Sequence, residues 1–216
     1  MNEFGKHPSE QLQAIFSERP FQIQEPEKAR IIFLGLDANY AEDLEQDHKL
    51  FQEFLGYMKD GVHYWKTEGI HTPMLKDYYR GGGKTYHRNF KKLGFTSDNA
   101  QDICFLELLN MCTFGNSTET STGRALFSRF LNSPDNRSHL QRIAKLANDE
   151  SKQIYICGDG KKTKEIFGNL NLFDARNVFA GKHFSAPNVS NKYLKAVGAA
   201  LRNFLVNGEY VPKDLN

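Results

Sequence analysis

The stretch RIIFLGLDANY, residues 30–40, decides the fold that we predict for this chain. Residues 31–36 form a short, continuously apolar run that ends at a turn, which is typical of a strand buried on both faces of a sheet. Asp37 stands where the chain has to turn. A carboxylate in that place is either the N-cap of a following helix or a functional group at the mouth of a site.

Three more strand-like segments follow, and segments with helical spacing separate them. The predicted strands cover residues 31–36, 102–110, 153–160 and 177–182. The predicted helices cover residues 41–59, 84–94, 124–146 with an interruption at Ser133 and Pro134, 161–170 and 193–205. Residues 60–83 have no clean period and are predicted to form a long loop. Strands that alternate with helices imply a parallel sheet covered on both sides, so the predicted fold class is α/β.

The bulk composition is that of one ordinary domain, residues 1–216, in which residues 1–29 form a polar lead-in with a helix and an extended segment. The cysteines and histidines have no metal-ligand spacing, so we expect reduced thiols and no metal. No signal peptide and no apolar stretch near ~20 residues are visible, which predicts a soluble, cytoplasmic protein without membrane contact. We expect a monomer. The net charge of +2 means that any surface for a polyanion has to be local.

Polar or flexible residues stand at the end of each predicted strand. Asp37 follows the first strand, Asn110 the second, residues 158–164 the third and His183 the fourth. In open α/β sheets, ligands bind in the crevice beyond the carboxyl ends of the strands. We therefore expect these four groups to converge on one site.

Four motifs resemble the ordered motifs of the uracil-DNA glycosylase superfamily. They are GLDANY (residues 35–40), FLELLN (105–110), IYICGDGKK (154–162) and HFSAPN (183–188). The resemblance implies a three-layer α/β/α fold with a four-stranded parallel sheet. It also implies an enzyme that hydrolyses the N-glycosidic bond of uracil, or of a related deaminated or damaged base, in DNA. Such an enzyme needs no cofactor, and its partner is DNA.

The same resemblance implies a role for each motif residue. Asp37 would orient the attacking water, and His183 would stabilise the leaving uracil anion. Asn110 would read the base through the donor and the acceptor of its amide. The other residues expected around the base are Gly35, Leu36, Asn39 and Tyr40. The residues expected against DNA are Gly158, Lys161, Lys162, Lys84, Ser185 and Asn188.

The motifs depart from the superfamily at positions that decide which base is accepted. The strongest uracil enzymes have GQDPYH, whereas Ala38, Asn39 and Tyr40 stand at the last three positions here. The exclusion of thymine is therefore open, unless Tyr40 takes over that task. The candidates for the ring that stacks on the base, which no motif identifies, are Phe51, Tyr78 and Tyr79.

Other interpretations of these residues stay open. Asp37 is also suited to cap a helix, and Asn110 to end a strand in a turn. GDGKKTK, residues 158–164, is either a phosphate cradle at a helix N-terminus or an ordinary solvated helix start. The alternative functions are a protein of the same fold that binds nucleic acid or a modified nucleotide without excising uracil, and a protein that binds a small phosphorylated ligand.

Overall fold

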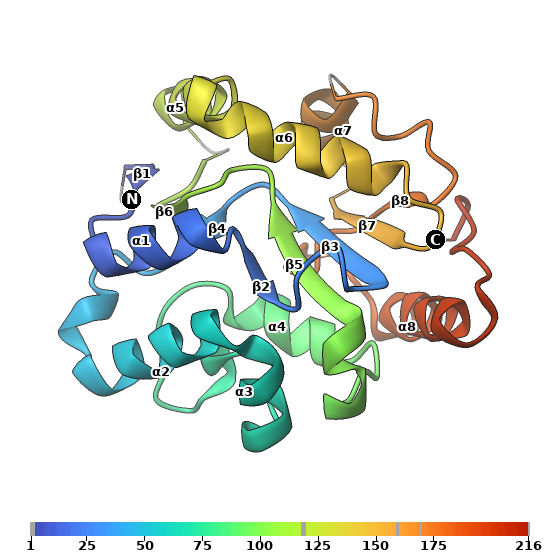
Figure 1. Ribbon diagram of the computed structural model, residues 1–216, viewed down its shortest axis with the longest axis horizontal. Coiled ribbons are helices and arrows are strands. Elements are labelled where there is room, and N and C mark those ends of the chain that lie inside the picture. The colour runs from blue at the N-terminus through green and yellow to red at the C-terminus, as the bar shows by residue number, and fades with distance from the viewer. Residues whose placement is uncertain (1–2, 118–119, 159, 169, 216) are drawn as a thin grey trace.

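The structure, a computed structural model, describes residues 3–117, 120–158, 160–168 and 170–215, and it confirms the predicted α/β class (Figure 1). Among these residues the central sheet has five strands. In spatial order they are β2 (Phe21–Ile23), β5 (Ile103–Glu107), β3 (Ile31–Gly35), β7 (Gln153–Cys157) and β8 (Val178–Gly181). Strands β5, β3, β7 and β8 are parallel neighbours, and β2 runs antiparallel to β5 at one edge.

The prediction of a four-stranded, all-parallel sheet is wrong by one strand. The extra strand, β2, lies in the segment 1–29, which we expected to contain only a helix and an extended lead-in. It pairs with residues 104–106 of β5. A strand of three residues is too short to show an alternating pattern, and Pro20 directly before it gives the segment the character of a loop.

Helices cover both faces of the sheet, and each face has its own apolar core (Figure 1). Ile31 and Phe33 of β3 belong to one core, and Ile32 and Leu34 belong to the other. The first core includes side chains of α1 (Glu10–Glu18), α2 (His48–Lys59), α3 (Gly61–Glu68), α4 (Lys84–Lys91) and α8 (Asn191–Asn207). The second core includes side chains of α5 (Ser121–Leu131), α6 (Pro134–Ala147) and α7 (Lys161–Gly168). Burial on both faces explains the continuous apolar run of β3.

Most of the predicted helices are confirmed, with changes at their ends. Helices α4 and α8 occupy predicted segments, and a break at Ser133 separates α5 from α6 as expected. The predicted helix 41–59 begins late. A 3₁₀ helix, Leu44–Gln46, comes first, and then Asp47 caps α2 by accepting a hydrogen bond from the backbone N–H of Leu50 at 3.1 Å.

The predicted long loop 60–83 is wrong in its first part, where α3 forms. Asp60 caps this helix by accepting from the backbone N–H of His63, and Gly69 ends it in the left-handed region with φ of 68°. Among the large side chains of α3, only Trp65 is buried. The helix therefore lacks an apolar period, although both of its end signals are present in the sequence.

A second, three-stranded sheet begins where β3 ends. Its strands, in spatial order, are β1 (Gly5–Lys6), β6 (Cys112–Phe114) and β4 (Ala38–Asn39). Strand β4 is parallel to β6, and β1 is antiparallel to it. The chain passes from β3 through Leu36 and Asp37 directly into β4, so Asp37 lies in the turn between the two sheets. The alternative in which Asp37 caps a helix is therefore wrong.

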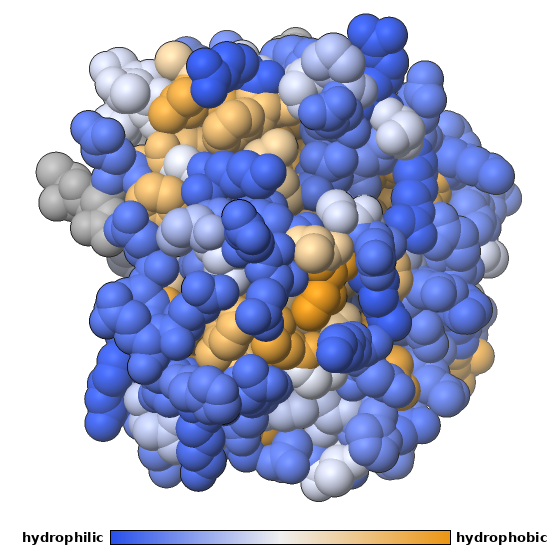
Figure 2. All heavy atoms as spheres, turned by 60° about the vertical axis from the view of Figure 1, so that its left-hand side comes forward, coloured by the Kyte–Doolittle hydropathy of each residue, from blue (hydrophilic) through white to orange (hydrophobic). Residues whose placement is uncertain are grey.

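Figure 2 shows the side of the molecule that lies to the left in Figure 1, where α1 and α5 are found. Hydrophilic side chains dominate this face, and hydrophobic areas are visible between them. In the part of the chain that the structure describes, none of the helices combines the length and the apolar character that a bilayer crossing requires.

Two glycines provide a matched test of the packing of α8. A Cβ atom at Gly198 would lie 2.1 Å from the carbonyl oxygen of Leu93, so the Gly198→Ala variant has to displace the backbone that follows α4. We expect it to lose about 1–3 kcal/mol in the free energy of unfolding, measured by urea denaturation. Gly56→Ala in α2 meets nothing within 4 Å. It should gain about 0.5–1 kcal/mol, because alanine loses less backbone entropy in a helix. Unchanged stability of Gly198→Ala would contradict this close packing.

Candidate functional site

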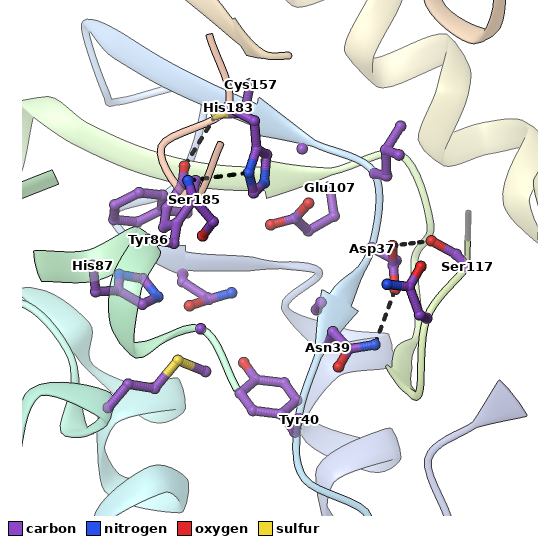
Figure 3. A pocket seen from close by; sticks show the side chains of 18 of the residues that line it. Asp37, Asn39, Tyr40, Tyr86, His87, Glu107, Ser117, Cys157, His183 and Ser185 are labelled. Carbon is purple, nitrogen blue, oxygen red and sulfur yellow. Dashed lines mark hydrogen bonds between the residues drawn. The ribbon is translucent and has the colours of Figure 1, made fainter. Parts of the chain in front are cut away.

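A cavity of about 550 Å³ opens at the edge of the sheet where β3, β5 and β7 end (Figure 3). Its volume is within the range of small-molecule sites. The order of the parallel strands reverses here, because β5, the next strand of this sheet along the chain, lies on one side of β3, and β7 lies on the other. Such a switch point, beyond the carboxyl ends of the strands, is where open α/β sheets bind their ligands.

Asp37 is held in the cavity wall by three side-chain donors. The hydroxyl of Thr113 donates to Oδ2 at 2.6 Å, the hydroxyl of Ser117 donates to Oδ1 at 3.0 Å, and the amide of Asn39 donates to Oδ2 at 3.4 Å. Burial raises the pKa of Asp37, and these three hydrogen bonds oppose the rise because they stabilise the charged form. The carboxylate is thus oriented by β4, by β6 and by the turn that follows β6.

Glu107 is a second carboxyl group in the same cavity, at the last position of β5 (Figure 3). It lies opposite Gly35 in the sheet, and a Cβ atom at Gly35 would lie 2.1 Å from its Oε2 atom. The glycine therefore makes room for the carboxyl group beside β3. Among the described residues, none donates a hydrogen bond to this carboxyl group. Burial, and after it the charge of Asp37, raise the pKa of Glu107 well above its ordinary value. Glu107 is therefore the carboxyl group of the pair that holds its proton more strongly, whereas the three hydrogen bonds to Asp37 favour the charged form of that group.

His183 follows β8 and presents a neutral imidazole to the cavity. The backbone N–H of Ser185 donates to Nδ1 at 3.2 Å, so Nδ1 is an acceptor and the ring proton lies on Nε2. The ring is accessible at the cavity mouth, and desolvation by the protein behind it lowers the pKa of His183. His183 is therefore a neutral N–H donor beside the cavity.

Helix α4 contributes Tyr86 and His87 to the lining. The hydroxyl of Tyr86 and the thiol of Cys157 form a hydrogen bond at 3.0 Å. Nδ1 of His87 lies 3.0 Å from Nε2 of His71, which is buried behind it. Burial lowers the pKa of His87 to about 3 and that of His71 well below its ordinary value, so both rings are neutral.

Two polar groups in the cavity wall lack hydrogen-bond partners among the described residues. Tyr40 is 2% exposed and points its hydroxyl into the cavity, where none of the described residues bonds to it (Figure 3). Gln22 of β2 accepts a hydrogen bond from the hydroxyl of Tyr57 at 3.0 Å, while its amide nitrogen has no described acceptor. An unsatisfied buried polar group costs about 1–3 kcal/mol, and this cost applies to the hydroxyl of Tyr40. The hydroxyl of Tyr40 therefore points to a polar ligand.

Most of the residues predicted around the base and the reacting bond lie together. The predicted residues that line the cavity are Gly35, Leu36, Asp37, Asn39, Tyr40, His183 and Ser185. Asn110 does not line it, because β5 ends three residues earlier, at Glu107. The side-chain amide of Asn110 instead donates to the carbonyl oxygen of Asp135 at 2.9 Å. The structure thus places Glu107, and not Asn110, at the strand end where we expected the residue that reads the base.

Lys84, predicted to contact DNA, is engaged within its own loop. Its Nζ atom donates to the carbonyl oxygens of Lys76 at 2.9 Å and of Tyr79 at 3.2 Å. These bonds close the loop that leads into α4, so the ammonium group stabilises the loop. A phosphate contact through Lys84 would compete with both bonds.

Of the other residues predicted to contact DNA, Lys161, Asn188 and Gly158 lie outside the cavity lining. Lys161 is exposed at the start of α7, and Asn188 is exposed in the loop before α8. Gly158 follows β7 with φ of 140°, a backbone conformation that glycine favours. The side chain of Lys162 lies outside the described part of the structure.

Sequence reasoning missed Glu107 and Tyr86. The available signal for Glu107 was a single acid inside the otherwise apolar run ICFLELL, residues 103–109. Tyr86 and His87 lie in a basic helix whose sequence does not show which face is buried. The tyrosine and phenylalanine rings that line the cavity are Tyr40, Tyr86 and Phe105. The three rings proposed for stacking, which do not line it, were Phe51, Tyr78 and Tyr79.

The chain matches no protein-family model, no curated protein and no solved structure. In the described part of the chain, no group of three or more His, Cys, Asp or Glu side chains is arranged to hold a metal ion. The groups that the cavity offers for chemistry are the Asp37 carboxylate, the neutral Glu107 acid and the N–H of His183. This set is suited to a hydrolysis in which positive and negative charge develop at different atoms.

The neutral state of Glu107 makes the stability of the protein depend on pH. The ordinary pKa of a glutamate is 4.5, and in the folded chain the pKa of Glu107 lies above it. Well below the ordinary value of 4.5, Glu107 is protonated in both the folded and the unfolded chain and does not affect stability. As the pH rises above 4.5, the unfolded chain loses this proton first. The free energy of unfolding then falls by up to about 1.4 kcal/mol per pH unit, until the folded state loses its proton too.

Glu107→Gln keeps the shape of the neutral acid and removes the fall in the free energy of unfolding at higher pH. We expect the variant to be more stable than the wild type at about pH 8 and equal to it near about pH 4, by urea denaturation. Glu18→Gln, the same substitution at an exposed position of α1, is the matched control. If Glu107→Gln is less stable than the wild type at about pH 8, the folded protein holds Glu107 as a stabilised anion, contrary to our assignment.

Proposed function

We propose that this protein is a DNA glycosylase that hydrolyses the N-glycosidic bond of uracil, or of a related deaminated or damaged base, in DNA. The observation that carries the proposal is the position of Asp37 and His183. A carboxylate held by three donors and a neutral N–H donor face one cavity from the ends of two strands (Figure 3). The resemblance of the four motifs to the uracil-DNA glycosylase superfamily supports the proposal. A sheet with four parallel strands between helical layers is consistent with it.

The two groups suit the two charges that the reaction creates. Breaking an N-glycosidic bond leaves positive charge on the sugar and negative charge on the base. Asp37 would attract the oxocarbenium-like carbon and orient the water that attacks it. His183 would donate its Nε2–H to the leaving base. Losing one such donor typically costs about 3–4 kcal/mol, or a factor of about 10²–10³ in rate.

The cavity walls suit a base that has left the DNA helix. The rings of Tyr40, Tyr86 and Phe105 line the cavity. Extrusion of the base costs a few kcal/mol, and contact with such rings offsets part of it. The proposed partner is DNA, and all the groups named come from one chain. None of the proposed steps uses a cofactor.

A second candidate function is binding of nucleic acid or a modified nucleotide without excision. It is favoured by the presence of Glu107 at the strand end, because a carboxyl group there would read a base differently from an amide. The other alternative, a small phosphorylated ligand, has less support. In the described part of the chain, no lysine or arginine lines the cavity, and phosphate sites normally contain one.

Replacement of Asp37 or His183 should abolish most of the excision activity. We expect Asp37→Asn and His183→Ala each to lower the rate of abasic-site formation by about 10²-fold or more. The substrates are labelled oligonucleotides with one uracil, single- and double-stranded, and the product is strand cleavage after alkali. Oligonucleotides with hypoxanthine or a thymine mismatch complete the panel.

Asp174→Asn and His48→Ala, both at exposed positions outside the cavity, are the matched controls and should keep wild-type rates. Equal rates in wild type and both cavity variants would show a contaminating activity or a wrong assignment of roles. Salt-dependent DNA binding without any abasic product would favour the second candidate, since log affinity then falls by about 0.9 per neutralised phosphate and log unit of salt.

A further inference from the structure

Among the described residues, the cavity combines acidic groups with neutral ones, and no cation lines it. No lysine or arginine lines it in the part of the chain that the structure describes. The titratable groups that line it beside Glu107 are Asp37 and Tyr40 after β3, Tyr86 and His87 in α4, Cys157 in β7 and His183 after β8. Burial lowers the pKa of both histidines, so they bring no positive charge. Such a cavity stabilises a ligand that brings N–H donors or positive charge.

The hydroxyl of Tyr40 points independently to a ligand with a polar edge. It is buried, directed into the cavity and without a partner among the described residues (Figure 3). It is also near enough to Glu107 that, after burial and two other neighbours, that carboxyl group contributes to the raised pKa of Tyr40. A phenylalanine would fill the same space without the unmet hydrogen bond. The hydroxyl and the carboxyl group therefore suit two parts of one ligand.

We propose that the cavity recognises the Watson–Crick edge of a guanine-type base. In this arrangement the two oxygens of Glu107 accept from N1–H and from the 2-amino group, and the hydroxyl of Tyr40 donates to O6. The inference rests on the proposed glycosylase function, and within that function it selects damaged guanine-type bases over uracil. The expected substrates are guanine derivatives whose N1–H and 2-amino groups are intact, such as those altered on the imidazole ring.

Hydrogen-bond matching separates this edge from the alternatives. A carboxylate only accepts, and its two oxygens fit two N–H donors on neighbouring atoms. Guanine offers such a pair beside a carbonyl group. Hypoxanthine lacks the 2-amino group, so one carboxylate oxygen would lose its donor. Uracil has a single N–H between two carbonyl groups, and a carboxylate that accepted from it would face a carbonyl oxygen.

Binding of this edge is coupled to the release of a proton. In the empty cavity Glu107 is protonated, because burial and the charge of Asp37 raise its pKa. When the two N–H groups reach its oxygens, the carboxyl O–H bond breaks, the electron pair stays on the oxygen and the proton passes to water. Gly35 leaves this place to the carboxyl group, since a Cβ atom at residue 35 would meet the Oε2 atom and the end of the Glu107 side chain would have to move.

The test is calorimetric titration of the full chain with 2′-deoxyguanosine, 2′-deoxyinosine and 2′-deoxyuridine. We expect deoxyguanosine to bind at least about 10-fold more tightly than either of the others, because it alone satisfies both oxygens. Its apparent binding enthalpy should change with the ionisation enthalpy of the buffer, which reports the released proton. Deoxyinosine is the matched ligand, since it differs only by the 2-amino group.

Two variants separate recognition from a structural role. Glu107→Gln should lose the preference for deoxyguanosine over deoxyinosine and the buffer dependence, and it should bind deoxyuridine more tightly than the wild type does. Tyr40→Phe should weaken deoxyguanosine binding without lowering the urea midpoint, because it removes an unsatisfied buried hydroxyl. Glu18→Gln, exposed in α1, is the control and should bind as the wild type does.

Equal or tighter binding of deoxyuridine by the wild type would overturn the inference, as would unchanged preference in Glu107→Gln or no nucleoside binding at all. Excision is measured separately, by mass spectrometry of the base released at neutral pH from duplexes with one uracil, 7-methylguanine or 8-oxoguanine. Release of uracil without guanine-type binding would support the glycosylase function and contradict the inference that the cavity recognises a guanine-type base. The guanine-type binding pattern without release of any base would instead contradict the proposed glycosylase function.

Discussion

Between β3 and β5, the carboxyl group of Glu107 lies so close to Gly35 that a side chain at residue 35 would displace it from its place. This contact exists in one register only. A shift of one residue would place a leucine opposite Glu107 and reverse which face each side chain occupies. The same register brings Phe33 and Phe105 together, with ring centroids 5.4 Å apart in the core on that face. The packing that holds the sheet together therefore also holds the carboxyl group at the cavity.

The cavity contains two carboxyl groups and treats them differently. Asp37 accepts from three side chains, which favours its charged form, whereas Glu107 has no described donor and lies near the charge of Asp37. Neighbouring acids whose surroundings differ in this way divide the roles of anion and proton carrier between them. The anion stands on the side of the turn into β4, and the neutral acid stands at the end of β5. A ligand that contacts both carboxyl groups meets the group that favours its charged form at Asp37 and a group that can release a proton at Glu107.

The alternation of strands and helices was sufficient to predict the α/β class. It was also sufficient to predict that Asp37 and His183 line the same cavity, because parallel strands end at one edge of a sheet. It was not sufficient to identify Glu107. The apolar run continues through Leu108 and Leu109, which are buried in the second core, so the sequence does not show where β5 stops. The strand β2 and the helix α3 were missed because each buries too few residues to produce a period. Short elements depend on tertiary contacts, and these are not visible in local patterns.

Glu107 and Tyr40 both carry a polar group where an apolar or neutral one would serve the fold better. A glutamine would avoid the pH-dependent loss of stability that a buried acid brings, and a phenylalanine would avoid an unmet buried hydrogen bond. One such departure could be an accident of packing. Two of them facing the same cavity, beside a glycine that leaves room for the acid, are hard to explain by the needs of folding. Groups that weaken a fold gather where it binds, since there a ligand supplies the missing partner. The fold alone does not identify that ligand, and so the hydrogen-bond pattern of these two side chains is the more specific guide to it.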